Sequence, residues 1–173
     1  ALYNAVLALF GSGDQVITHA PGWPTIVEQI KLADAEPVIV RTAPEEGFRV
    51  RAEAVLSAIT PRTRGIILNS PGNPTGAVMS EPELGRLADG LAKRDIWVIL
   101  DLCYEQLIYD NTLNNLPRVL WERLADRTVL VGTASESYAM PGWRCGWLLA
   151  PAEVAVGGNV VQSHSTSHAT SIT

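Results

Sequence analysis

Hydroxyl side chains and an arginine gather between Thr133 and Trp147, in the stretch TASESYAMPGWRCGW. An apolar run from Thr128 to Val131 precedes this stretch and is typical of a buried strand. Hydroxyl groups donate hydrogen bonds to phosphate oxygens, and the guanidinium fork of Arg144 can bind two such oxygens at once. The residues at the end of this strand therefore indicate a phosphate-binding site.

Chemically useful side chains also follow the earlier apolar runs. Asp101 closes the run WVIL, Asn73 lies in the loop PGNPTG after GIILN, and Trp23 lies in the turn PGWP after QVITH. A carboxylate at the end of a buried strand is costly unless it is paired, so Asp101 either meets a ligand cation or caps a turn. Trp23 can stack on a flat cationic ring or can simply belong to the core.

The elements that must position these residues alternate between strand and helix. Near-continuous Val, Ile and Leu runs separated by helix-length segments predict a mainly parallel, doubly wound α/β sheet with helices on both faces. Ligands of such folds bind beyond the carboxyl ends of the strands, which is where the residues above lie. The expected strands are Gln15–His19, Pro37–Arg41, Gly65–Asn69, Trp97–Leu100, Thr128–Gly132 and Gly146–Ala150.

Helices are expected between and around these strands. A capping box, Ser80 with Glu83 three residues later, predicts the start of one of them. A last helix begins at Pro151, and Gly157 and Gly158 are expected to weaken it. A polar loop is expected over Asp110–Pro117, and the other helices over Ala1–Phe10, Thr25–Ala33, Arg51–Ile59, Glu81–Arg94 and Val119–Ala125.

Composition limits the classes of function. The chain of 173 residues has 47% apolar residues and a net charge of −5, with its arginines and lysines scattered. One globular domain is expected, and neither nucleic acid nor a membrane is an expected partner. Cys103 and Cys145 lie in no metal-type or disulfide-type spacing, which predicts reduced, buried thiols in a cytoplasmic protein.

Structural roles are expected for the three histidines and for three further tryptophans. The three histidines share no spacing typical of a metal site, so solvated or capping roles are expected for His19, His164 and His168. Cys103 and three tryptophans are expected to pack in the interior: Trp97, Trp121 and Trp143.

The stretch from Thr133 to Trp147 resembles the signature of the class I and II aminotransferases, pyridoxal-phosphate (PLP) enzymes of fold type I. Thr133, Ser135, Arg144, Gly146 and Trp147 fall in register with it. The loop NPTG and the spacing of Asp101 and Tyr104 match two further motifs of the family, in the family's order. The resemblance covers the chain, residues 1–173, as part of the PLP-binding large domain. It implies that the N-terminal arm and the C-terminal small domain lie outside these residues.

The resemblance also implies a role for each site residue. Asp101 would keep the pyridine nitrogen protonated, and Asn73 and Tyr104 would share the phenolic oxygen of the cofactor. Trp23 would cover the ring, and the phosphate would be held by three residues: Thr133, Ser135 and Arg144. An amino acid and a 2-oxo acid would be the substrates, and the enzyme would be a homodimer.

One position departs from the family pattern. Eight residues before the arginine the family has the lysine that carries the cofactor, and here that residue is Glu136. A glutamate cannot form the Schiff base, so the predicted amino transfer should be impaired. Lys31 and Lys93 are each late in a helix and are expected to lie far from the strand ends.

Two alternatives to the aminotransferase therefore stay open. One is a binding or regulatory module that keeps the fold without the chemistry, and the other is a PLP-dependent lyase or synthase of the same fold. A part of a larger domain should also expose apolar surface, so instability or aggregation of the isolated chain is expected.

Overall fold

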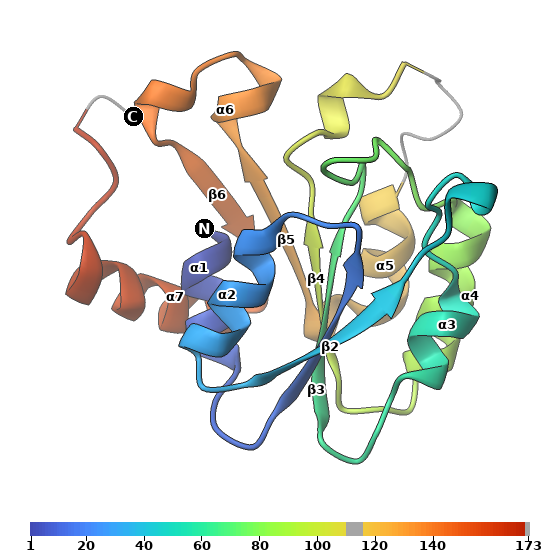
Figure 1. The fold of residues 1–173 in the computed structure, drawn as a ribbon. Coiled ribbons are helices and arrows are strands. Elements are labelled where there is room, and N and C mark those ends of the chain that lie inside the picture. Colours follow the sequence, from blue (N-terminus) through green and yellow to red (C-terminus); the bar gives the residue numbers. More distant parts are fainter. Residues whose placement is uncertain (110–115, 172–173) are drawn as a thin grey trace.

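The computed structural model describes residues 1–109 and 116–171 and contains a six-stranded sheet in the order β2-β1-β3-β4-β5-β6 (Figure 1). The paired strands β1 to β5 run parallel, and β6 is antiparallel to β5. The predicted mainly parallel α/β fold is therefore confirmed. The strands are β1 Gln15–Ala20, β2 Glu36–Arg41, β3 Thr63–Asn69, β4 Trp97–Asp101, β5 Thr128–Thr133 and β6 Gly146–Leu149.

Helices cover both faces of this sheet (Figure 1). One face carries α1 Leu2–Leu9, α2 Pro24–Leu32 and α7 Ala152–Ser165, and the other carries α3 Ala52–Ser57, α4 Glu81–Leu91 and α5 Leu116–Leu124. The short helix α6, Ala134–Ser137, follows β5 directly. Single turns of 3₁₀-helix complete the connections: η1 Pro44–Glu46, η2 Glu105–Leu107, η4 Ala125–Arg127 and η5 Pro141–Trp143.

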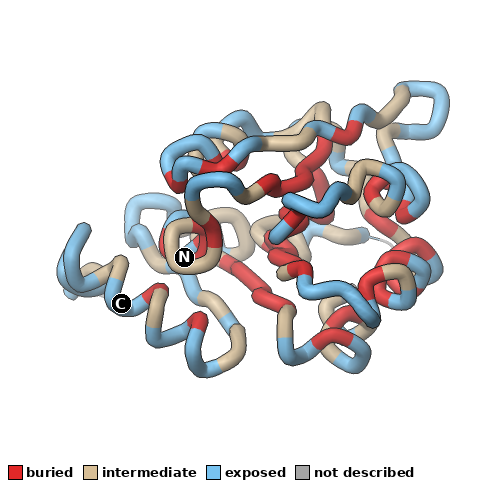
Figure 2. The backbone as a smooth tube through the Cα atoms, turned by 90° about the horizontal axis from the view of Figure 1, so that it is seen from below, coloured by how far each residue is buried: buried red, intermediate tan, exposed pale blue. Residues whose placement is uncertain are grey.

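The apolar runs form two cores because successive strand residues point to opposite faces of the sheet. Ile66 and Leu68 of β3 pack under α3, α4 and α5, whereas Ile67 packs under α1 and α2. Burial on both faces explains why β3 and β4 are continuously apolar rather than alternating. The buried stretches run through the middle of the molecule in Figure 2.

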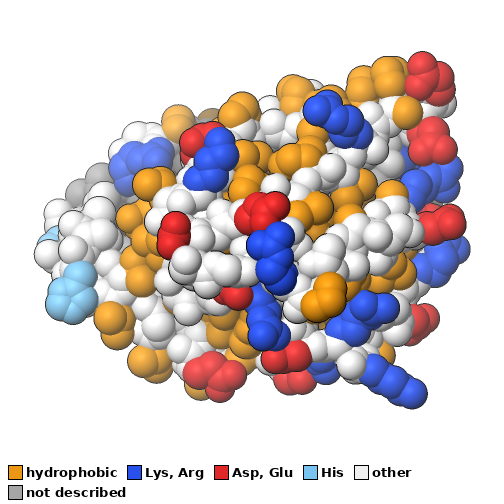
Figure 3. Space-filling view, turned by 60° about the horizontal axis from the view of Figure 1, so that its bottom comes forward, with side chains coloured by type: hydrophobic (Ala, Val, Ile, Leu, Met, Phe, Trp, Pro, Cys, Tyr) orange, Lys and Arg blue, Asp and Glu red, His pale blue; other side chains and the backbone are white. Residues whose placement is uncertain are grey.

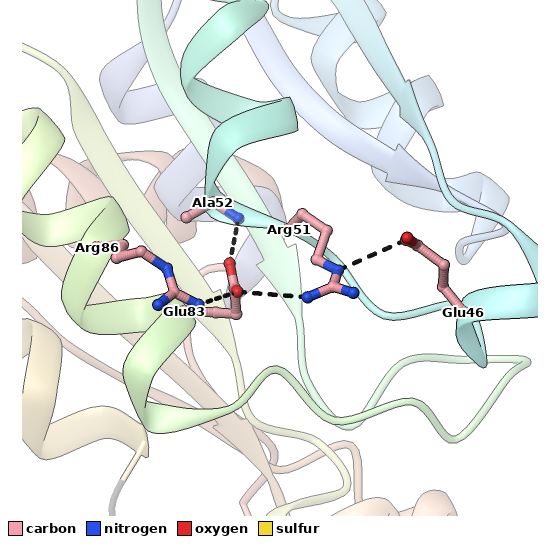
Figure 4. Close-up of polar contacts among 5 residues, drawn as sticks. All are labelled: Glu46, Arg51, Ala52, Glu83 and Arg86. Atoms are coloured by element: carbon pink, nitrogen blue, oxygen red, sulfur yellow. Dashed lines mark hydrogen bonds and ion pairs between the residues drawn. The ribbon is translucent and has the colours of Figure 1, made fainter.

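The predicted capping box at the start of α4 is wrong. The Ser80 side chain makes no capping hydrogen bond, and Glu83 instead accepts one from the backbone N–H of Ala52, 2.7 Å away (Figure 4). Ala52 is the first residue of α3, so its N–H has no partner within its own helix. Glu83 also pairs with Arg86 and Arg51. Glu83 of α4 therefore caps the neighbouring helix α3 instead of its own helix.

The helix α7 runs unbroken from Ala152 to Ser165, so Gly157 and Gly158 do not interrupt it, and their weakening of the helix stays a prediction. A Cβ atom added to Gly157 would lie 3.2 Å from the Ala8 side chain, and one added to Gly158 would lie 3.3 Å from Leu148. The two glycines therefore allow α7 to pack closely on α1 and β6.

The surface agrees with the scattered charges of the sequence. On the face in Figure 3, basic and acidic side chains are interleaved and form no single-sign stripe. Large apolar side chains are exposed on β6 and α7, namely Trp147, Leu149, Val156 and Val160. Among the described residues, no helix is long and apolar enough to cross a membrane. Most of the predicted loop Asp110–Pro117 falls outside the described residues, and α5 begins within its end, at Leu116.

Candidate functional site

The carboxyl ends of β1, β3, β4 and β5 meet at two adjoining cavities. The larger, about 440 Å³, is lined by residues that include Trp23, Asp101, Thr133, Ser135, Glu136 and Arg144. The smaller, about 230 Å³, is lined by residues that include Asn73 and Tyr104, and it shares Trp23, Asp101, Cys103 and Glu136 with the larger. The fold therefore brings all eight residues singled out in the sequence to one place.

Asp101 lies at the end of β4 and is 2% exposed. Its Oδ1 accepts a hydrogen bond from the backbone N–H of Cys103 at 3.1 Å. Burial raises the pKa of the Asp101 carboxyl above its ordinary value, and the negative charge of Glu136 adds to the increase. A cation in the cavity would lower the cost of ionising this carboxyl.

Asn73 and Tyr104 lie on the loops that follow β3 and β4. The Asn73 side-chain amide donates a hydrogen bond to the Tyr104 hydroxyl at 3.2 Å. The backbone N–H of Asn73 donates in turn to Oδ1 of Asn69, at 2.8 Å. Asn69, the last residue of β3, also lines the smaller cavity; its place at a strand end is the sequence signal for it, although no family motif assigns it a role.

The turn that carries Trp23 is fixed by His19. Nε2 of His19 accepts a hydrogen bond from the backbone N–H of Asn69, and Nδ1 lies 3.2 Å from the carbonyl oxygen of Pro21. Nδ1 therefore carries the proton, and burial lowers the pKa of the imidazole below its ordinary value. Of the two expected roles, solvated or capping, the solvated one is wrong for His19, because its buried side chain links β1, β3 and the Trp23 turn through backbone groups.

The hydroxyl of Thr133 organises the start of α6. Its Oγ1 accepts a hydrogen bond from the backbone N–H of Ser135 and lies 3.0 Å from the carbonyl oxygen of Cys145. Arg144 has a left-handed backbone conformation with φ of 51°, and its guanidinium donates to the Pro141 carbonyl at 2.7 Å. Ser135 and Arg144 thereby present a hydroxyl and a cationic fork on the same cavity.

Two of the residues expected to pack in the interior lie elsewhere. Cys103 lines both cavities, and burial followed by the charge of Asp101 raises the pKa of its thiol, which keeps it neutral. Trp143 is 42% exposed. Trp97 and Trp121 do pack against the cores. Both cysteines are free, as predicted, but neither Cys103 nor Cys145 is fully buried.

No lysine is among the residues that line these two cavities. Lys31 lies in the last turn of α2 and pairs with Glu28 at 2.8 Å, and Lys93 follows the end of α4. Within residues 1–109 and 116–171, no cluster of side chains could hold a metal ion. Arg144 is the one cationic side chain that lines either cavity in this part of the chain.

A third cavity is larger, about 650 Å³, but is chemically poorer. Asn73 of the NPTG loop and Tyr104 line it as well, but the rest of its lining is mainly apolar, including Pro71, Val78 and Leu107. Because no ionisable carboxylate, arginine or lysine lines it, we place the functional site at the two cavities that share Asp101.

Comparisons with known proteins agree with the α/β fold described above. The family model "Aminotransferase class I and II" matches residues 1–173. An aspartate aminotransferase of Streptomyces avermitilis is 39% identical over 169 residues, which are 97% of this chain and 41% of that protein. An aspartate/prephenate aminotransferase of Cereibacter sphaeroides is 39% identical over 99% of this chain and 43% of its own length. The crystal structure of the aspartate aminotransferase from Rhizobium meliloti superposes with a TM-score of 0.93 at 38% identity, again over 99% of this chain and 43% of that one.

Proposed function

The chain belongs to the class I and II aminotransferases, and from this premise we propose that it holds the PLP site of an enzyme that transfers an amino group between an amino acid and a 2-oxo acid. The observation that carries the proposal is the lining of one cavity by Asp101 and Arg144, which are far apart in the sequence. A carboxylate, a guanidinium and a hydroxyl on one cavity suit the two charged groups of a phosphorylated pyridine.

The residues present fit this cofactor at the ring and at the phosphate. The Asp101 carboxyl accepts hydrogen bonds from the backbone N–H and the thiol of Cys103, and a carboxylate has further lone pairs with which it can pair with a protonated ring nitrogen. The Asn73 and Tyr104 pair can bind the phenolic oxygen, and Trp23 can stack on the ring. Gln29, which also lines the larger cavity, has a buried side-chain oxygen that finds no hydrogen-bond partner among the described residues, as expected of a site built for a polar ligand.

When bound, PLP supplies an electron sink for carbanion chemistry at the substrate carbon. The chain's own residues would bind and orient it. An ionised Asp101 would pair with the protonated ring nitrogen, and Asn73 and Tyr104 would bind the phenolic oxygen. Ser135 and Arg144 would hold the phosphate.

The same residues do not fit covalent attachment of the cofactor. Glu136 occupies the position of the family lysine, and no lysine lines either cavity. We infer that the chain as written is impaired in amino transfer. Glu136 thus favours a second candidate function, a module that binds the cofactor without turnover. A lyase or synthase of the same fold would use the same cavities and would differ in its substrate contacts.

The whole protein is a matter for proposal, because the chain spans about two fifths of the length of the relatives named above. We propose that residues 1–173 are part of the large, cofactor-binding domain of a cytoplasmic homodimer. The names of the relatives suggest aspartate as the amino donor.

Substitution of Glu136 by lysine tests the assignment. The Glu136→Lys variant, treated with PLP and then borohydride, should gain the mass of one reduced cofactor on the peptide that contains residue 136. The parent should not be labelled at this peptide, and labelling of Lys31 or Lys93 in both proteins would report non-specific reaction. Absence of the label at residue 136 in a folded variant would refute the proposed site.

A further inference from the structure

We propose that Glu136 makes this site select the aminated form of the cofactor, pyridoxamine phosphate, over PLP. The inference rests on the proposed function, since it assumes that the cofactor ring lies in the two cavities lined by Glu136 and Asp101. It concerns binding alone and involves no covalent step.

The first observation is the environment of the Glu136 carboxylate. Glu136 lies in α6, is half-buried and lines both cavities. Within residues 1–109 and 116–171, its side chain makes no hydrogen bond or ion pair. The ionisable side chains that face it across the smaller cavity are Asp101, Cys103 and Tyr104, and its charge raises the pKa of each of them, after the larger effect of burial. The carboxylate therefore forms no ion pair with a cation in the described part of the chain, although Arg144 and the amino group of Ala1 line the larger cavity with it.

The second observation is the distribution of positive charge. Arg144, the one cationic side chain that lines the site in the described part of the chain, lines only the larger cavity, and the amino group of Ala1, which also lines that cavity, acts on Asp101. Asp101 and Glu136 both line the smaller cavity as well, and one protonated ring nitrogen can pair only with Asp101. A ligand whose ring occupies the smaller cavity thus needs a second positive charge to pair with Glu136.

The two natural forms of the cofactor differ in this respect. PLP carries a neutral aldehyde, which can only accept hydrogen bonds, at the carbon that the family lysine binds. Pyridoxamine phosphate carries an ammonium group at that carbon, with three N–H donors that a carboxylate can accept. The ring and phosphate are common to both forms, so Glu136 should decide the difference in affinity. A charge-assisted hydrogen bond predicts binding about 10- to 100-fold tighter for the aminated form.

Pyridoxine phosphate provides the matched neutral ligand, because it has a hydroxyl at the same carbon and cannot react with amines. Dissociation constants of pyridoxamine phosphate, pyridoxine phosphate and PLP are measured by calorimetry for the chain and for three variants. Glu136→Gln keeps the size of the side chain and removes its charge, and Glu136→Lys reverses the charge. Glu105→Gln removes an acidic group nearby that is not among the residues lining the two cavities.

The chain and Glu105→Gln should prefer pyridoxamine phosphate to pyridoxine phosphate by at least about tenfold. Glu136→Gln should lose most of this preference, and Glu136→Lys should reverse it. An equal affinity for the two ligands in the chain, or an unchanged preference in Glu136→Gln, would overturn the inference. If Glu136→Lys still attaches PLP in that case, the proposed function survives. Binding of no ligand by any folded variant would overturn both.

Discussion

The side-chain amide of Asn73 donates a hydrogen bond to the hydroxyl of Tyr104, 3.2 Å away, and joins the loop after β3 to the turn after β4. These loops are separated in the sequence by α4, and the parallel pairing of β3 with β4 brings their ends together. The pair thus marks where the phenolic oxygen of a bound pyridine would lie.

Removing either partner should weaken cofactor binding. We expect Asn73→Ala and Tyr104→Phe each to raise the dissociation constant of pyridoxine phosphate roughly 2- to 10-fold, the effect of one neutral hydrogen bond. The double variant should be affected less than the product of the single effects, because both groups act on one oxygen. Tyr138→Phe is the control, since Tyr138 is 70% exposed. Fully multiplicative effects would show that the two residues act separately.

Arg144 should act on the phosphate and not on the ring. In Arg144→Ala the affinity for pyridoxine phosphate should fall about 10- to 100-fold, because a charged hydrogen-bond donor is lost. Affinity for pyridoxine, which lacks the phosphate, should stay unchanged. Arg144→Lys should recover part of the loss, since a lysine keeps the charge but not the fork. If Arg144→Ala lowers the affinity for both ligands equally, Arg144 does not bind the phosphate.

The ends of the strands could be predicted because a strand that is buried on both faces appears in the sequence as a continuous apolar run. The run GIILN appears as β3, and the run WVIL with Asp101 as β4, with boundaries that differ by two residues or fewer. Residues placed just after such runs meet at one edge of a parallel sheet, whatever their distance along the chain. This rule, with the family motifs, accounts for the convergence of Trp23, Asn73 and Asp101.

The contacts missed from the sequence are those that carry no spacing pattern. His19 interacts with Asn69, 50 residues away, through a ring nitrogen and a backbone N–H. Neither residue type predicts this hydrogen bond. Glu83 fits a local capping pattern, but Ala52 of another helix offers a better donor. Only the packing of the helices, which follows from the whole fold, decides between local and distant partners.

Loss of the Glu83 carboxylate should destabilise the protein. Burial acts to raise the pKa of Glu83, but the Ala52 hydrogen bond and the charges of Arg86 and Arg51 outweigh it, so the pKa lies below its ordinary value. We expect Glu83→Ala to cost about 1–3 kcal/mol, chiefly because the buried N–H of Ala52 loses its acceptor. The melting temperature should fall by about 2–4 °C per kcal/mol.

The control is Glu122→Ala, which removes an exposed ion pair with Arg118 and should cost less than about 0.5 kcal/mol. Because the pKa of Glu83 is lowered on folding, its contribution is present above the pKa of the unfolded chain and is lost as the pH falls through the folded value. The gap between parent and variant should therefore narrow in acid. A stability difference between the parent and Glu83→Ala that does not change with pH would contradict the role of the Glu83 charge.

The turn before Trp23 should accept only glycine at residue 22. A Cβ atom at Gly22 would lie 2.5 Å from the carbonyl oxygen of His19, a contact that requires the backbone to move. We expect Gly22→Ala to cost about 1–3 kcal/mol and to shift the fluorescence of Trp23. Gly11→Ala, where a Cβ meets nothing within 4 Å, is the control and should leave both unchanged. Equal melting temperatures for the two variants would contradict this account.

The buried Asp101 carboxylate should lower the free energy of unfolding while it favours binding of a cationic ligand. The pH dependence of unfolding tests the first effect. Burial, with the charge of Glu136, raises the pKa of Asp101 above its ordinary value of 3.8, so ionisation favours the unfolded chain. The cost is absent below the ordinary pKa, where both states are protonated. This free-energy cost grows as the pH rises from the ordinary pKa to the pKa of Asp101 in the folded chain, and it is constant at higher pH. Asp101→Asn stays neutral throughout and keeps an oxygen for Cys103 N.

We therefore expect Asp101→Asn to melt at a higher temperature than the parent at neutral pH, by about 2–4 °C for each kcal/mol recovered. This difference should shrink as the pH approaches 4, about where an unfolded aspartate takes up its proton. Asp89→Asn is the control, because the Asp89 side chain is 73% exposed. Adding pyridoxine phosphate should raise the melting temperature of the parent more than that of Asp101→Asn, since only the carboxylate pairs with a protonated ring nitrogen. If Asp101→Asn is less stable than the parent at neutral pH, the carboxylate supports the fold and has not been placed for a ligand.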